Sequence, residues 1–168
     1  MTSVLSSQFL EAIATTIALD VQRIALLILP ATSPVKAVIG ELQDMGINVR
    51  GLGLQDEERG KAELLQSTLK KFKVGRQPRN NAEQAEVPDL LVATHTSIRG
   101  LDFPDLTHVF IAGVPGEGEE YAHAAGRVGR FGREGKVVMF LEQKDEKKAA
   151  AMYQRLDICP SEFEDIQI

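Results

Sequence analysis

Five short aliphatic runs, separated by helical patterns, constrain the fold of this chain more than any other feature. Each run is rich in branched aliphatic residues and is bounded by Pro, Gly or Asp, which is typical of buried strands. The runs are IALLILP (24–30), INVRGLG (47–53), DLLVATH (89–95), THVFIAG (107–113) and KVVMFLE (136–142). Helices are predicted at the N-terminus (1–23) and at 33–46, 56–72, 117–129 and 143–156.

This alternation of strands and helices predicts an α/β fold with a mostly parallel central sheet and helices on both of its faces. Parallel neighbours need a crossover connection, and a helix is the usual crossover. Ligands of such sheets gather at the carboxyl ends of the strands, so we expect function in the loops that follow them.

The length predicts one domain over residues 1–168, because a chain of 168 residues that is 43% hydrophobic can bury one sizeable core.

One segment interrupts the alternation of strands and helices. VGRQPRNNAEQAEVPD (74–89) is polar, contains two prolines and lacks apolar periodicity. We predict that it is a mobile surface insertion.

Composition argues against several kinds of site. Cys159 is the only cysteine, so the chain cannot form an internal disulfide, and the histidines are too far apart to form a local metal motif. The three histidines are His95, His108 and His123. No apolar run approaches the roughly 20 residues that cross a bilayer, and the N-terminus resembles no targeting signal. We expect an intracellular protein without metal ligands or membrane contact.

The segment EYAHAAGRVGRFGREGK (120–136) contains three Gly-Arg pairs in a chain whose formal net charge is -5. Glycine allows a backbone to approach a ligand closely, and arginine holds phosphate in a planar fork. We predict a helix that runs through His123 towards Gly129. On such a helix Arg127 and Arg130, three residues apart, would lie on nearly the same face and converge on one phosphate, as arginine fingers do.

Two other interpretations of this segment are open. A flexible Gly-Arg tract that binds RNA fits poorly, because the predicted strand at 136–142 follows at once. An ordinary helix C-terminus, with arginine near the last carbonyls and glycine beyond, explains the same residues without a ligand.

Two long stretches resemble motifs of the DEAD-box family of superfamily 2 helicases. HAAGRVGRFGREG (123–135) resembles motif VI, H-R-x-G-R-x-G-R-x-G-x-x-G, and LLVATHTSIRGLDFPDLTHVFIAGVP (90–115) resembles motif V and its following strand. Residues 24–52 and the KKFKVG stretch (70–75) resemble other parts of the same domain more weakly. The resemblance implies the C-terminal RecA-like domain of an ATP-dependent RNA helicase, a three-layer sandwich around a mostly parallel sheet.

The resemblance also implies roles for single residues and for partners. ATP and Mg would be bound mainly by a separate N-terminal RecA-like domain of the same protein, RNA would be the substrate, and a protein cofactor could assist. The residues that match the family's functional positions are Arg127 and Arg130 as arginine fingers, Gly100 and Asp102 at the ATP ribose, Thr94, Thr32 and Arg59 at the RNA, and Arg99 and His123 in the network between them.

Three of these residues also have structural interpretations. Asp102 could be a turn or capping residue before Pro104, and Thr94 could be a β-branched strand residue that packs. Arg59 lies among three acidic residues, and a salt-bridged position on a helix explains it more simply than RNA binding does.

The sequence also departs from the family pattern. His95 stands where motif V has aspartate, Ala124 stands where motif VI has its first arginine, and Leu29 and Gly53 replace a phenylalanine and a histidine. These departures put efficient unwinding in doubt. The chain has no G-x-x-x-x-G-K-[ST] phosphate loop, so it should be inactive alone. Two hypotheses follow: one half of a working RNA helicase, or a degenerate helicase domain that serves as an RNA- or protein-binding scaffold.

Overall fold

The structure is a computed structural model that describes residues 5–19, 25–52, 88–98, 106–116, 118–129, 132 and 134–161. The helices are α1 (Ser7–Leu19), α2 (Val35–Asp44), α5 (Gly118–Ala125) and α6 (Glu146–Leu156), with a 3₁₀ turn η2 (Gln143–Asp145) before α6. The strands are β1 (Ala25–Leu29), β2 (Val49–Gly51), β3 (Leu90–Thr94), β4 (His108–Ala112) and β5 (Lys136–Phe140). All five predicted strands are confirmed. The helix predicted at 56–72 lies outside the described residues.

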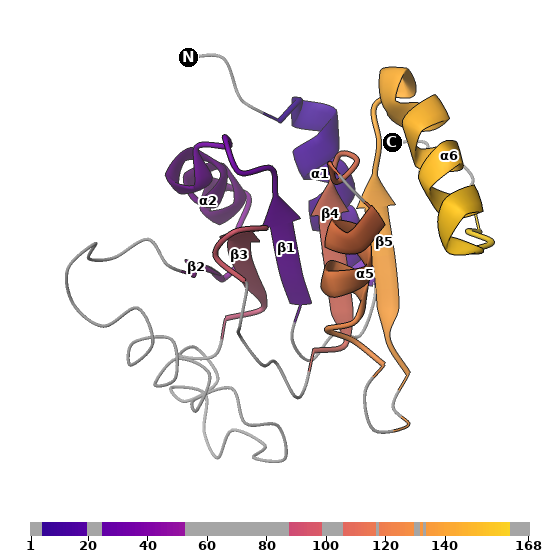
Figure 1. Cartoon of the computed structure of the whole chain (residues 1–168). Helices are drawn as coiled ribbons and strands as arrows, with labels where there is room; N and C mark the ends of the chain where they lie inside the picture. The colour runs from indigo at the N-terminus through magenta and orange to yellow at the C-terminus, as the bar shows by residue number, and fades with distance from the viewer. Residues whose placement is uncertain are drawn as a thin grey trace.

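The five strands form one sheet in the order β2-β3-β1-β4-β5, and every neighbouring pair is parallel. The predicted parallel sheet is therefore confirmed (Figure 1). In the centre, Leu29 at the end of β1 pairs in register with Thr94 at the end of β3. The loops that follow these two strands consequently begin side by side at the carboxyl edge of the sheet.

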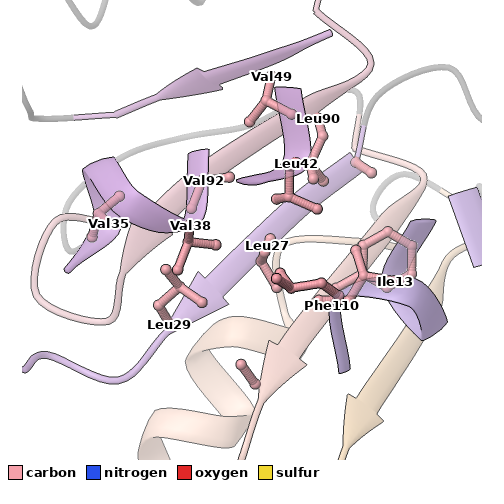
Figure 2. Packing of buried hydrophobic residues seen from close by; sticks show 13 residues of the cluster. Ile13, Leu27, Leu29, Val35, Val38, Leu42, Val49, Leu90, Val92 and Phe110 are labelled. Carbon is pink, nitrogen blue, oxygen red and sulfur yellow. The ribbon is translucent and has the colours of Figure 1, made fainter. Parts of the chain in front are cut away.

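Strand alternation sorts the core into two clusters, one on each face of the sheet. Strands β1, β3 and β4 are buried along their whole length, so both of their faces are covered, as is usual for parallel sheets. The first cluster joins α1 and α2 to the sheet (Figure 2), and its labelled members are Ile13, Leu27, Leu29, Val35, Val38, Leu42, Val49, Leu90, Val92 and Phe110.

The second cluster packs α5 and α6 against the opposite face. Its strand residues are the alternate ones, such as Leu91 and Ala93 of β3, and they share one buried cluster with Tyr121 and Ala124 of α5 and Met152 of α6. Helices therefore cover both faces of the sheet, as the alternation of elements predicts, and the three layers are α1 and α2, the sheet, and α5 and α6.

The predicted insertion at 74–89 falls outside the described residues, except at its end. There Pro88 is buried, and the backbone of Asp89 is held between strands. The Asp89 N–H donates to the carbonyl of Asn48 (2.9 Å), and the Asp89 carbonyl accepts from the N–H of Ala25 (3.3 Å). Pro88 and Asp89 directly precede β3, at the amino end of the strand. The predicted mobility of residues 74–87 is not tested.

Candidate functional site

Helix α5 ends earlier than predicted, and the Gly-Arg segment begins where it ends. The helix stops at Ala125 rather than continuing to Gly129. The N–H of Gly126 still donates to the carbonyl of Ala122 (2.8 Å), but those of Arg127 and Val128 donate only three residues back, to Ala124 and Ala125 (both 3.2 Å). The chain tightens and then turns at Gly129, whose φ of 71° is left-handed.

The prediction that Arg127 and Arg130 share one face of a helix is therefore wrong, because Arg127 lies beyond the helix. The local geometry is that of a helix C-terminus with glycine beyond it, the interpretation that needs no ligand. The Arg127 side chain is half-buried, and its Nε is shielded from solvent. Shielding of the Nε restricts the rotamers open to this side chain.

Gly135, which the sequence reasoning did not single out, allows the Gly-Arg segment to pack tightly against the start of β5. A Cβ at position 135 would lie 2.6 Å from both the Gly129 nitrogen and the Val128 Cβ. No ordinary Cβ tolerates such contacts. The spacing of glycines at 126, 129, 132 and 135 was the available signal, since it marks where backbones approach each other.

A cluster of hydroxyl groups lies at the carboxyl end of β3. Thr94 is only 8% exposed, and its Oγ1 lies 2.9 Å from both the Thr96 Oγ1 and the Ser97 Oγ. The Ser97 N–H donates to the Thr94 carbonyl (3.0 Å) and also approaches its hydroxyl (3.3 Å). Thr94 is thus a buried strand residue, and the exposed Thr96 is the member of the cluster that reaches solvent.

Thr32 lies in the loop that follows β1. The loop is exposed at Thr32, and its backbone is closed by a hydrogen bond from the Ser33 N–H to the Pro30 carbonyl (3.0 Å). Because Leu29 and Thr94 are register partners, the loop after β1 and the turn after β3 start next to each other. The structure brings these two candidate RNA-binding residues to one edge of the sheet.

Arg127 lies two residues beyond the C-terminal end of α5. The helix starts after the carboxyl end of β4 and ends before the start of β5, so it runs against the strand direction (Figure 1). Its eight residues span about 12 Å at about 1.5 Å per residue. Of the candidate residues, Thr94 ends β3 and Thr32 lies in the loop after β1, where we expect ligand-binding residues, whereas Arg127 lies between α5 and β5.

Two of the four departures from the family motifs, Ala124 and His95, differ in their surroundings. Ala124 is fully buried in the cluster under α5. His95 directly follows β3 and is half-buried; burial lowers the pKa of its imidazole, and the negative charge of Glu120 partly offsets this by raising that pKa. The Glu120 carboxylate itself accepts a hydrogen bond from the Gly116 N–H (3.0 Å).

Several candidate residues are outside the described part of the chain, and His123 is exposed in the last turn of α5. The undescribed candidates are Gly100, Asp102, Arg130, Arg59 and Arg99. In the described ranges no group of three or more His, Cys, Asp or Glu side chains converges as metal ligands would. None of the helices in those ranges has the length and hydrophobicity needed to traverse a bilayer.

Comparison with known proteins gives consistent similarities. The family model "Helicase conserved C-terminal domain" matches residues 55–132. The ATP-dependent RNA helicase DBP8 of Kluyveromyces lactis is 33% identical over 117 residues, which cover 62% of this chain and 27% of that protein. This chain therefore spans about a quarter of that relative's length.

Solved structures show the same fold. The C-terminal domain of the DEAD-box protein Dbp5 matches with a TM-score of 0.66 and 20% identity, over 92% of this chain and 82% of that one. The E. coli DEAD-box protein SrmB, solved bound to regulator of ribonuclease activity A, matches with a TM-score of 0.69 and 21% identity, over 88% of this chain and 78% of that one. At these identities the likeness concerns the fold, and it confirms the predicted RecA-like sandwich.

Proposed function

On the premise that this chain belongs to the C-terminal RecA-like domains of the DEAD-box RNA helicase family, we propose that it is one half of an ATP-dependent RNA helicase. In this proposal the chain supplies arginine fingers and part of the RNA-binding surface. A separate N-terminal domain of the same protein binds ATP with Mg, and hydrolysis of that ATP drives the reaction. RNA and ATP as substrates imply an intracellular setting.

The observation that carries the proposal is the placement of Arg127. Arg127 lies just beyond α5, its side chain is half-buried and its Nε is shielded from solvent, which restricts the rotamers open to it. A guanidinium has five donors in one plane, and this geometry fits phosphate oxygens. We propose that Arg127 and Arg130 reach the γ-phosphate, and that Gly100 and Asp102 contact the ribose.

The RNA surface in this proposal is the carboxyl edge of the sheet. Hydroxyl groups and backbone N–H groups commonly contact phosphates without reading sequence. Thr32 is exposed in the loop after β1, and the hydroxyl cluster of Thr94 opens to solvent at Thr96. Arg59 would add a charge to this surface. Arg99 and His123 would connect this surface to the residues that contact the nucleotide. A protein cofactor could bind the same domain; SrmB, for example, was solved bound to regulator of ribonuclease activity A.

The two contacts would lie at opposite ends of α5, and this separation gives the helix a role in the proposal. RNA binding would act on the loops where α5 begins, and the arginines would act on nucleotide beyond the residue where it ends. Because its buried residues Tyr121 and Ala124 share a core cluster with the sheet, we expect this short helix to move together with the sheet. Closure of the two domains would therefore bring one end of α5 to the RNA and the other end to the nucleotide at the same time.

A decisive experiment measures RNA-stimulated ATP hydrolysis by the full-length protein that contains this chain. Replacing Arg127 and Arg130 by alanine should reduce the stimulated rate by about 10³-fold or more, because an arginine finger contributes on that order to phosphoryl transfer. Arg155→Ala provides a matched control, because Arg155 is an exposed arginine of α6 outside the proposed site. Unchanged hydrolysis in the double variant would refute the proposal.

A second candidate function is supported by Ala124. This position is fully buried, so it cannot present the charged group that motif VI places there. A domain that has lost this group could persist as a scaffold for RNA or protein. A folded full-length protein that binds single-stranded RNA but shows no stimulated hydrolysis would favour the scaffold.

A further inference from the structure

An open groove lies between α1 and the turn that follows α2. Its volume is about 430 Å³, and all of its lining residues are at least partly exposed. They are Ala14, Thr15, Ile17 and Ala18 of α1, Met45, Gly46 and Ile47 after α2, and Asp89 before β3. Because Ile47 and Asp89 precede strands, the groove lies at the amino edge of the sheet, opposite the loops that carry Thr32 and the Thr94 cluster.

Hydrogen bonds fix the backbone on two sides of the groove. After α2, the Gly46 N–H donates to the Gln43 carbonyl (2.9 Å), and the Ile47 N–H donates to the Leu42 carbonyl (3.1 Å). These two bonds, with Gly46 in the left-handed region (φ 86°), close the helix as a Schellman motif. The backbone of Asp89 is held by the chain before β2 and by β1. The groove is therefore preformed, and a ligand can enter it with little ordering of this chain.

The groove is largely apolar, and its most prominent side chain is Met45. This methionine is 43% exposed, and among the described residues it is the one large hydrophobic side chain that is exposed. It lines the groove together with the half-buried Ile17 and Ile47 and the exposed Ala18. A single exposed apolar residue is ordinary, whereas an apolar surface that continues into a groove is typical of a binding site. Methionine suits such a surface because its unbranched, polarizable side chain adapts to a partner.

The charges around the groove are acidic. Asp89 lines it, Asp44 directly precedes its methionine, and Glu11 lies one turn before the groove residues of α1 on the same helix face; all three are exposed. Helix α1 has no basic residue, and Lys36 lies in the first turn of α2, at the far end from the groove. Arg50 follows the β2 residue that packs under α2, so its side chain points to the other face of the sheet. The groove therefore favours a cationic ligand.

We propose that this groove docks a segment of a partner protein that inserts a large aliphatic or aromatic side chain between α1 and Met45 and places a lysine or arginine beside Asp89. RNA fits this surface poorly, because acidic side chains repel phosphates. The role of such a partner as a helicase cofactor rests on the proposed function. The groove itself does not depend on ATP hydrolysis, so the two proposals can fail separately.

The test begins with a phage-displayed library of random peptides selected on the 168-residue chain. Enriched peptides should carry a large apolar residue close to a lysine or arginine. A synthetic peptide of the enriched sequence should shift the NMR amide signals of Ala14, Met45 and Gly46. A library without enrichment, or enriched peptides that lack a basic residue, would overturn the proposal.

Variants of the chain then test the two contacts with that synthetic peptide. Met45→Ala should weaken binding about 10-fold or more, as for a central apolar contact of an interface. Asp89→Asn should weaken it about threefold, as for an exposed ion pair, and added salt should remove this difference. Gln154→Ala and Glu119→Gln are the matched controls, because both residues are exposed on the helices of the opposite face and should leave binding unchanged.

Circular dichroism should show that each variant is folded, which is expected because the replaced side chains are exposed. Binding that is unaffected by Met45→Ala in a folded chain would overturn the groove as the docking site.

Two other occupants are distinguished by their own outcomes. Sedimentation of the chain alone should give a monomer; a dimer that Met45→Ala dissociates would overturn the proposal in favour of a second copy of this chain. A single-stranded RNA should not displace the peptide, and competition between them would overturn a separate protein site. A full-length protein that binds the peptide but shows no RNA-stimulated hydrolysis would refute the proposed function and leave the groove in place.

Discussion

At the scale of single residues, the absence of one Cβ at position 135 lets the Gly-Arg segment pack against β5. Gly135→Ala would place a methyl group 2.6 Å from the Gly129 nitrogen and the Val128 Cβ, so the segment that carries Arg127 must shift. We expect a loss of about 1–3 kcal/mol in the free energy of unfolding, as for other overpacked sites. Chemical denaturation followed by circular dichroism measures it.

The matched control for this change is Gly40→Ala. Gly40 lies inside α2, and a Cβ there would have no atom within 4 Å. Alanine should stabilise the chain by about 0.5–1 kcal/mol, because glycine in a helix interior loses more backbone entropy on folding. If Gly135→Ala stabilised the chain as Gly40→Ala does, the close approach of the two segments would be refuted.

At the scale of elements, α5 and α6 meet through the only two tyrosines of the chain. The Tyr121 and Tyr153 rings pack edge to face, with centroids 5.8 Å apart and an interplanar angle of 89°. Burial, and secondarily the charge of Tyr121, raises the pKa of Tyr153 to about 12, and burial also raises the pKa of Tyr121. Both tyrosines should therefore titrate above their ordinary value.

The sign of the effect on stability follows from these directions. A folded-state pKa above the unfolded value means that the fold favours the neutral phenol, so this stabilisation is complete below pH 10 and is lost as pH rises towards 12. Tyrosinate absorbance, recorded with circular dichroism to monitor folding, measures the titration. In Tyr121→Phe the remaining Tyr153 should still titrate late, because burial is the larger cause; an ordinary midpoint would contradict the packing of α5 on α6.

The positions of elements were largely predictable from sequence, and their ends were not. Aliphatic runs predicted all five strands because fully buried parallel strands need continuous apolar residues. The end of α5 was missed because helical periodicity continues past Ala125, whereas the backbone turns at Gly129. The glycine spacing signals a close approach of the backbone, but that Gly135 meets Val128 depends on how the chain folds back between them.

At the scale of the whole molecule, we expect that this chain does not hydrolyse ATP by itself. It contains no G-x-x-x-x-G-K-[ST] segment to hold the phosphates, and it spans 27% of the relative DBP8. A phosphate-release assay on the purified 168-residue chain, with and without RNA, should give only the background rate. Turnover that co-purifies with the chain and is lost in Arg127→Ala would show that an active site is complete within it.

The motif resemblance predicted the fold and the candidate functional residues. The topology of the sheet determines where these candidates lie relative to one another. Thr32 and Thr94 are brought together because β1 and β3 are neighbours, although their order in the sheet cannot be read from either strand. Arg127 is separated from them because α5 runs back along the sheet. The hydroxyl cluster around Thr94 was not predicted, since it depends on the fold of the turn after β3.

The central position of β1 has a consequence for how this domain is made. Ala25 pairs with Leu90 on one side and with His108 on the other, so the first strand of the sheet must wait for partners that are far along the chain. Contacts between such distant residues carry a large loop-closure entropy, and they slow folding. On the ribosome, where domains emerge from the N-terminus, the aliphatic β1 would stay without its sheet partners until both later strands had been synthesised, and a chaperone that shields it during that interval would raise the yield of folded protein.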